Sequence, residues 1–80
     1  MKTIFVIEIF ERDSSSFVNQ LELEKTDLQT MRRIFSVNQD DPYMYNSYKI
    51  DEAINEELYI SAAVKVNIQR YDCYGGYRSP

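Results

Sequence analysis

The chain of 80 residues carries nine basic and thirteen acidic residues, and its net charge is −4. A chain of this length forms one domain and buries roughly 60% of its unfolded surface on folding, which excludes a catalytic cleft between two domains. The chain has one cysteine, Cys73, and no histidine. This composition excludes an internal disulfide and the usual zinc and iron–sulfur frameworks. No metal or cofactor is expected.

The N-terminal segment contains an apolar run, Ile4 to Ile7, that Glu8 interrupts before it reaches the length of a signal peptide. No stretch approaches the roughly 20 apolar residues of a membrane span. Together with the lone thiol, these features predict a cytoplasmic protein that does not bind membranes.

The acidity is concentrated in the middle of the chain. Residues 40–57 hold six acidic residues and one basic residue, Lys49, so this segment has a charge of −5 and the remainder has +1. An acidic field attracts basic partners, whereas a nucleic-acid ligand requires a basic stripe. The pattern predicts a basic protein partner and no direct binding of nucleic acid.

Two strands are predicted at the N-terminus. In residues 3–12 both alternating sets of side chains are apolar, which is typical of a central strand covered on both faces. Residues 17–24 mix apolar and polar positions after the turn RDSSS, so we expect a half-exposed strand that pairs with the first as a hairpin.

A helix is predicted to begin at Thr26 and to end near Ser36. Thr26 as N-cap and Gln29 three residues later fit a reciprocal capping box, and Asp27 complements the helix dipole. Residues 38–42 are typical of a loop. The expected buried stripe consists of Leu28, Met31, Ile34 and Phe35.

A second helix is expected over residues 51–59, after a short strand within 45–50. Asp51 is the expected N-cap of this helix, and Glu52 favours the positive end of its dipole. The side chains expected to point inward are Ala53, Ile54 and Leu58.

The position of the last strand is ambiguous. Apolar residues occupy every second position from Leu58 to Ile68, so a strand placed at 62–72 could begin as early as Leu58. Gly75 and Gly76 are expected to release a flexible tail over about 75–80. Residues 1–80 are thus predicted to form one α+β domain, a small antiparallel sheet with two helices against one face.

The sequence offers no catalytic constellation. Without histidine, acid–base chemistry would need carboxylates, lysine or tyrosine, and no spacing singles out such a pair. Cys73 lacks a histidine to activate it and is expected to be an ordinary thiol. The protein is therefore not expected to be an enzyme.

Seven tyrosines and no tryptophan suggest a protein interface. Tyr48 is expected in the core, whereas Tyr59 and Tyr71 are expected on the outer side of the last strand. Tyrosine gives large, rigid contact area at low entropic cost, so it is enriched at interfaces. The acidic residues of the second helix have a simpler alternative role, since charges on an exposed helix face are ordinary.

Four segments together resemble the small bacterial immunity proteins that neutralise nuclease bacteriocins and contact-dependent growth-inhibition toxins, including the cloacin-type immunity proteins. The segments are FVIEIFERDSSSFVNQLEL, TDLQTMRRIF, DDPYMYNSYKIDEA and VNIQRYDCYGGY. The resemblance implies a cytoplasmic stoichiometric inhibitor that binds the basic toxin domain of its own cell at the nucleic-acid cleft or a neighbouring exosite. It leaves open whether the toxin cuts RNA or DNA.

The expected contact set combines carboxylates, which suit a cationic surface, with tyrosine anchors. Its members are Asp40, Asp41, Tyr43, Tyr45, Glu52, Glu56, Tyr71 and Tyr74. One alternative is a phage anti-CRISPR or another nucleic-acid mimic that uses the same acidic surface. Another is a homodimer in which an exposed edge strand at 62–72 pairs with its copy.

Overall fold

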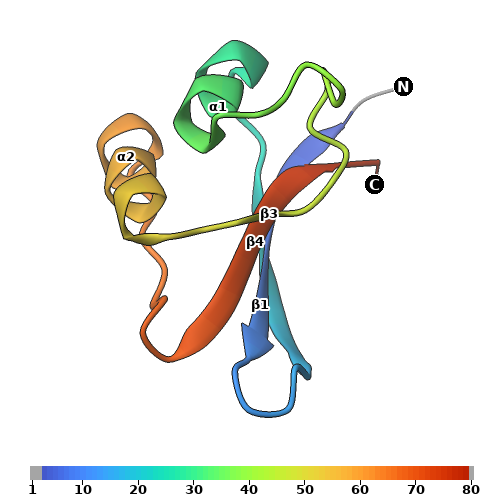
Figure 1. Cartoon of the computed structure of the whole chain (residues 1–80). Helices are drawn as coiled ribbons and strands as arrows, with labels where there is room; N and C mark the ends of the chain where they lie inside the picture. The colour runs from blue at the N-terminus through green and yellow to red at the C-terminus, as the bar shows by residue number, and fades with distance from the viewer. Residues whose placement is uncertain (1–2, 80) are drawn as a thin grey trace.

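The computed structural model describes residues 3–79 and shows one antiparallel sheet with two helices against one of its faces (Figure 1). The strands lie in the order β2-β1-β4-β3. This arrangement confirms the predicted α+β fold. The elements are β1 (Ile4–Glu11), β2 (Phe17–Leu23), α1 (Leu28–Phe35), β3 (Tyr48–Lys49), α2 (Glu52–Ala62) and β4 (Tyr71–Arg78).

The β1–β2 hairpin is confirmed to within one residue at each end. Phe5 pairs with Leu23 and Ile7 with Leu21, so these apolar side chains share one face of the sheet. The expectation that β1 is covered on both faces holds only in part: Val6 on the second face is buried, at 5% exposure, although no described helix covers that face (Figure 1). Both helices lie on the side of Phe5 and Ile7, and Phe10 on the opposite side stays partly exposed.

The core fills the space between the sheet and the two helices. The Phe5 ring meets Tyr77 edge-on at a centroid distance of 5.2 Å and Phe35 at 5.8 Å. Each fully buried side chain of this size contributes roughly 1.5–3 kcal/mol of hydrophobic stabilisation. The core cluster is Phe5, Ile7, Met31, Ile34, Phe35, Met44, Ile50, Leu58, Val66, Cys73 and Tyr77.

Helix α1 begins one residue later than predicted, because Asp27 and not Thr26 is its N-cap. The Asp27 carboxylate accepts hydrogen bonds from the backbone N–H of Thr30 at 3.0 Å and from its hydroxyl at 2.8 Å. The Thr26 hydroxyl lies 2.7 Å from the hydroxyl of buried Tyr77 and is engaged there. The predicted end is confirmed, since Ser36 takes the left-handed conformation of a C-cap.

Helix α2 has the predicted N-cap but is longer than expected. Asp51 accepts a hydrogen bond from the N–H of Ile54 at 2.8 Å, and the helix continues to Ala62. Leu58 is buried as predicted, whereas Ala53 is exposed and Asn55 is buried instead. The cause is the helical period, which places Asn55 and Leu58, three residues apart, on one face.

The prediction of a strand at 62–72 is wrong, because residues 63–70 form an irregular connection and β4 begins at Tyr71. The Asn55 amide donates to the Val66 carbonyl at 2.9 Å, and its oxygen accepts from the Val66 N–H at 3.1 Å. These two bonds satisfy the N–H and C=O groups of Val66, which in a sheet would pair with a neighbouring strand. Val66 and Ile68 still point inward. The alternating pattern therefore indicates correctly which side chains of this connection point inward, although the segment is not part of a sheet.

Gly75 and Gly76 lie inside β4 and do not release a flexible tail. A Cβ at Gly75 would come within 2.8 Å of Phe5 Cζ and 2.9 Å of Phe35 Cζ, and one at Gly76 within 2.4 Å of the Asn46 carbonyl oxygen. Close approach of neighbours therefore requires both glycines. Of the predicted tail, residues 75–78 belong to the strand, Ser79 is exposed and residue 80 lies outside the described part.

The predicted short strand within 45–50 is confirmed only at β3, where Tyr48 pairs with Gly75 and Lys49 with Tyr74. Tyr48 is half-buried against the core, as expected. Tyr77, which the sequence placed in a flexible tail, is part of the core. Tyr59 does not belong to a strand, since it lies exposed on α2.

Candidate partner-binding site

The sheet face opposite α1 and α2, hereafter the open face, carries an aromatic row made of Phe17, Phe10 and Tyr74. Alternation along β1 turns Phe10 away from the core, and its ring meets Phe17 at 5.8 Å and Tyr74 at 5.9 Å, both edge-on. The Phe17 side chain is 56% exposed. The row thus crosses β2, β1 and β4 on a face that neither described helix covers.

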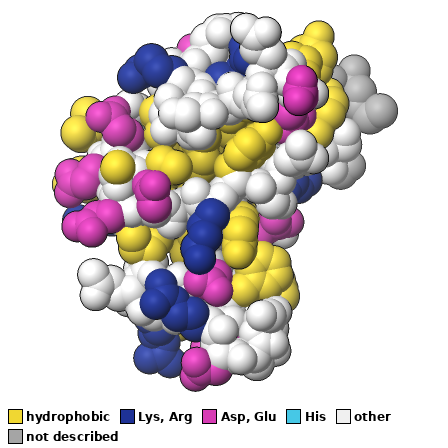
Figure 2. All heavy atoms as spheres, viewed as in Figure 1, with side chains coloured by type: hydrophobic (Ala, Val, Ile, Leu, Met, Phe, Trp, Pro, Cys, Tyr) yellow, Lys and Arg dark blue, Asp and Glu magenta, His cyan; other side chains and the backbone are white. Residues whose placement is uncertain are grey.

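Ion pairs border the aromatic row. Asp72 lies 3.4 Å from Arg12 and 3.6 Å from Lys49, and Arg78 lies 3.4 Å from Glu8. Figure 2 shows basic, acidic and hydrophobic side chains directly beside one another over the sheet. Such partly exposed pairs stabilise the fold little, typically by less than about 1 kcal/mol each. An apolar centre with a charged border is the usual anatomy of a protein interface.

The loop before β3 is organised around Asp41, which is 8% exposed. Its carboxylate accepts hydrogen bonds from the Tyr48 hydroxyl at 2.6 Å and from the backbone N–H groups of Asn46 and Tyr45, each at 2.9 Å. The Tyr48 bond and these N–H groups hold the pKa of the Asp41 carboxyl below its ordinary value. Asp41 therefore builds the loop and is not free to bind a partner.

Tyr43 and Tyr45 lie exposed on the same loop, and their rings stack at a centroid distance of 5.7 Å. Asp40, just before Asp41, is also exposed. Of the four members of the predicted contact set on this loop, these three are exposed and Asp41 is buried. Figure 2 shows hydrophobic and acidic side chains side by side in this region.

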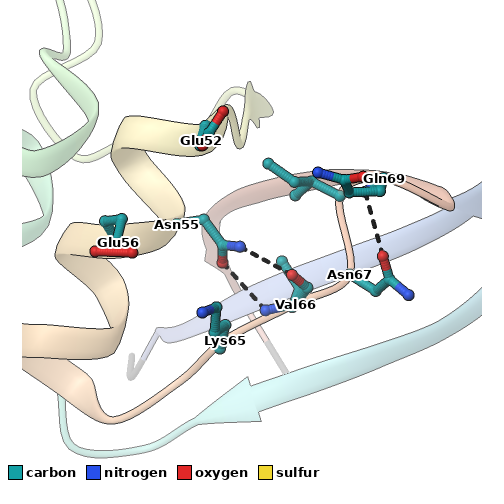
Figure 3. Close-up of a pocket in the computed structure, with 8 residues that line it drawn as sticks. Glu52, Asn55, Glu56, Lys65, Val66, Asn67 and Gln69 are labelled. Carbon is teal, nitrogen blue, oxygen red and sulfur yellow. Dashed lines mark hydrogen bonds between the residues drawn. The ribbon is translucent and has the colours of Figure 1, made fainter.

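A groove of about 530 Å³ runs between α2 and the irregular connection 65–69 (Figure 3). Glu52 and Glu56, one helical turn apart, line it from α2, and Lys65 lines it from the connection. Within residues 3–79 neither glutamate has an ion pair. Buried Asn55 holds the connection against the helix and so maintains the shape of the groove.

The structure divides the predicted contact set and does not gather it on one surface. The loop of residues 40–47, hereafter the tyrosine loop, the groove and the open face each hold some of its members. Asp41 is buried, and Tyr71 packs against the core and does not lie on the outer side as predicted. Sequence reasoning missed Phe10 and Phe17. The signal was available, because two helices cover only one face of a sheet and Phe10 lies on the opposite parity from Phe5 and Ile7.

Cys73 is buried in the core, and burial followed by the neighbouring charge of Asp72 raises the pKa of its thiol. This environment suits the ordinary thiol that the sequence predicts. Residues 3–79 contain no cluster of three potential metal ligands. Neither of the two described helices has the length and apolar character to cross a membrane.

The comparison with known families covers nearly the whole domain. No curated protein matches the chain. A family model described as a domain of unknown function, DUF7683, matches residues 4–74, from the start of β1 into β4. The chain therefore belongs to the DUF7683 family.

Proposed function

We propose that this protein is an immunity protein, an inhibitor that binds a basic nuclease toxin one to one in the cytoplasm of the cell that makes both. It acts by binding and not by catalysis. The aromatic row is the observation that carries the proposal, because three rings lie in contact on a sheet face that no described helix covers. Aromatic anchors near the centre of an interface supply most of its binding energy.

The surroundings of the row support a role in binding. Much of the Phe17 surface is exposed and would be buried by a partner. Full burial of an aromatic residue removes about 150–250 Å² of surface from water. The Arg78 guanidinium lies within 2.6 Å of the position a Gly76 Cβ would occupy, so one part of the open face is already covered by this side chain. The aromatic row remains as its uncovered apolar part.

The exposed carboxylates act as a steering field in this proposal. Asp40, Glu52, Glu56 and Glu57 are all exposed, and the protein carries −4 overall. A nuclease presents lysine and arginine to phosphates, so opposite fields accelerate encounter without every carboxylate touching the partner. The association rate should consequently fall as salt rises.

The two alternatives fit the geometry less well. A nucleic-acid mimic needs free carboxylates on its contact surface, whereas the exposed carboxylates of residues 40–57 lie at α2 and on the loop before β3, and the carboxylates beside the aromatic row, Asp72 and Glu8, are ion-paired. A homodimer through an edge strand at 62–72 lacks most of that strand, because residues 63–70 form none and β4 pairs with β1 along its length.

The test begins with affinity capture from the host by tagged protein at about 0.15 M salt, followed by titration of the captured nuclease activity. We expect one basic nuclease at a ratio of 1:1, with activity lost at one equivalent and binding weaker at about 0.5 M salt. Phe17→Ala should weaken inhibition, whereas the control Ile60→Ala, which removes an exposed apolar side chain from α2, should not. Recovery of only a self-dimer, or of a nuclease that stays active when saturated, would refute the proposal.

A further inference from the structure

The stacked pair Tyr43 and Tyr45 lies outside the aromatic row and has no role in the core. The two side chains are 57% and 58% exposed, and their ring planes are 28° from parallel. Met44, which stands between the two tyrosines in the sequence, is fully buried. The tyrosine loop thus anchors itself through Met44 and presents both phenol rings to solvent.

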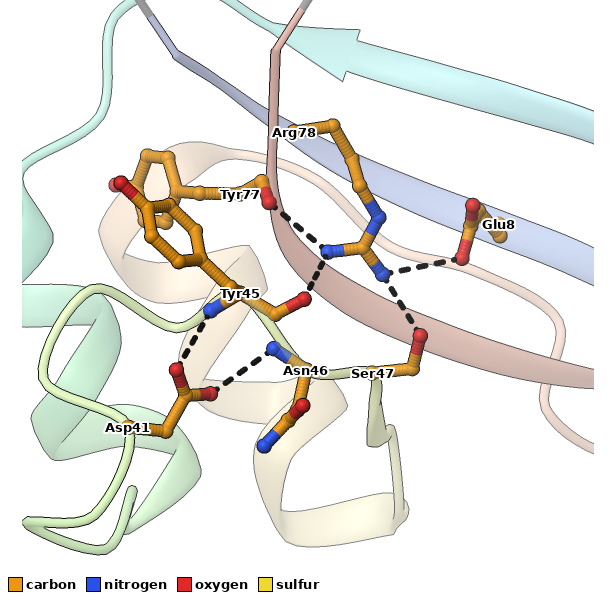
Figure 4. Close-up of polar contacts among 7 residues, drawn as sticks. All are labelled: Glu8, Asp41, Tyr45, Asn46, Ser47, Tyr77 and Arg78. Atoms are coloured by element: carbon orange, nitrogen blue, oxygen red, sulfur yellow. Dashed lines mark hydrogen bonds and ion pairs between the residues drawn. The ribbon is translucent and has the colours of Figure 1, made fainter.

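Hydrogen bonds fix this loop from both sides (Figure 4). The Asp41 carboxylate accepts from the N–H groups of Tyr45 and Asn46. The Met44 carbonyl accepts from the Tyr77 N–H at 2.8 Å, and the Tyr45 carbonyl accepts from Arg78 Nη1 at 3.0 Å. The backbone that carries the pair is held in this way, so it loses little further conformational entropy when a ligand binds.

The chemistry of the loop favours a cation. Aromatic faces attract positive charge, and Asp40 in the same loop is exposed with no ion pair among residues 3–79. The neighbouring Arg78 is not free to neutralise the negative charge of Asp40, because its guanidinium is bound to Glu8, Ser47 and two backbone carbonyls.

We propose that Tyr43, Tyr45 and Asp40 form a preformed site for an arginine side chain of a protein partner. A guanidinium is planar, weakly hydrated and able to stack on a ring while it hydrogen-bonds a carboxylate, whereas the ammonium of lysine is strongly hydrated. The choice of a protein partner rests on the proposed function. The site itself is separate from the aromatic row, so the two can fail independently.

The probe is a pair of capped peptides of equal charge, Gly-Arg-Arg-Gly and Gly-Lys-Lys-Gly, titrated into the free protein at about 0.15 M salt. Binding is followed by the NMR shifts of tyrosine ring protons. We expect the arginine peptide to bind about two- to fivefold more tightly, the ratio that an exposed cation–π contact provides. The largest shifts should fall on Tyr43 and Tyr45.

Three variants make the test specific. Tyr43→Ala and Tyr45→Ala should each abolish the preference for arginine. Tyr59→Ala should retain it, because Tyr59 is equally exposed, at 57%, but lies on α2. Equal binding of the two peptides, or largest shifts at the α2 groove, would overturn the site.

The test also separates this inference from the proposed function. Phe17→Ala should weaken nuclease inhibition and leave the arginine preference intact. If the preference holds while no nuclease is inhibited, the function is wrong and the arginine site stands. If a nuclease is inhibited but the two peptides bind alike, the arginine site is wrong and the function stands.

Discussion

The two faces of the sheet carry similar aromatic residues and use them differently. On the covered face Phe5 and Tyr77 meet edge-on at 5.2 Å and are buried. On the open face Phe10 and Phe17 meet edge-on at 5.8 Å, and Phe17 is largely exposed. The ring geometry is alike, and the difference is the helix layer, which buries the rings of the covered face and leaves Phe17 available to a partner (Figure 1).

The largest expected effect is the loss of a ring from the covered face. Phe5 is completely buried, so Phe5→Ala should lower the free energy of unfolding by about 3–5 kcal/mol through lost burial and a cavity. Urea denaturation followed by circular dichroism measures this change. Phe10→Ala, the open-face counterpart in the same strand, should cost clearly less, and equal losses would remove the distinction between the faces.

The open face should show the opposite pattern. Phe17→Ala is expected to change the free energy of unfolding by no more than about 0.5 kcal/mol, because the side chain is mainly in solvent. It should weaken toxin binding by about 2 kcal/mol, the cost of a lost interface anchor. Calorimetric titration against the captured nuclease tests the second value. A variant that unfolds readily yet binds normally would assign Phe17 to the fold.

The two glycines of β4 test how closely each face is packed. Gly75→Ala should lower the free energy of unfolding by about 1–3 kcal/mol, because its Cβ would collide with the Phe5 and Phe35 rings on the covered face. Gly76→Ala should lie at the upper end of this range, since it would meet the fixed carbonyl of Asn46. Thermal denaturation of both variants gives the comparison, and a stabilised Gly75→Ala would contradict the close packing of the Phe5 and Phe35 rings on this glycine.

Hydrophobic periodicity accounts for the parts of the fold that could be predicted. The hairpin, the buried stripe of α1 and the Asp51 cap follow from local patterns, and the structure confirms them. The last strand could not be placed, because its alternating signal at residues 58–69 belongs partly to a helix and partly to a connection held by Asn55. A long-range side-chain bond of this kind leaves no local pattern.

The candidate site was only partly predictable for a related reason. The −5 segment correctly located exposed carboxylates on α2 and in the tyrosine loop, but it also included Asp41, whose bonds to Tyr45, Asn46 and Tyr48 make it internal. Charge counts do not distinguish a carboxylate that binds its own backbone from one that is free. The open face could have been inferred, because two helices cover only one face of a sheet and Phe10 lies on the opposite parity from Phe5 and Ile7.

The smallest expected effect concerns the contact that joins the exposed loop to the covered face. Tyr48 packs against Phe35 at 6.4 Å and donates its hydroxyl proton to Asp41. That bond lowers the Asp41 pKa below its usual 3.8, whereas burial and then the same bond raise the pKa of Tyr48 above 10.0. The lowered carboxyl pKa stabilises the fold above pH 3.8, and this stabilisation is lost as the pH falls through the pKa of the folded state. The raised phenol pKa stabilises the fold below pH 10.0, and this stabilisation is lost as the pH rises through the pKa of the folded state.

Tyr48→Phe should therefore weaken the pH dependence of stability at both ends and lower the plateau between them by about 1 kcal/mol, the typical net contribution of one intramolecular hydrogen bond. Urea midpoints measured from about pH 2 to 11 test this against Asp40→Asn, which removes a neighbouring charge but keeps all three bonds to Asp41. If the tyrosine variant kept the wild-type acid limb, the Tyr48 bond would not control Asp41. A retained acid limb would leave the backbone N–H groups as the main support of that carboxylate, and the loop that presents Tyr43 and Tyr45 would then be fixed without help from the covered face.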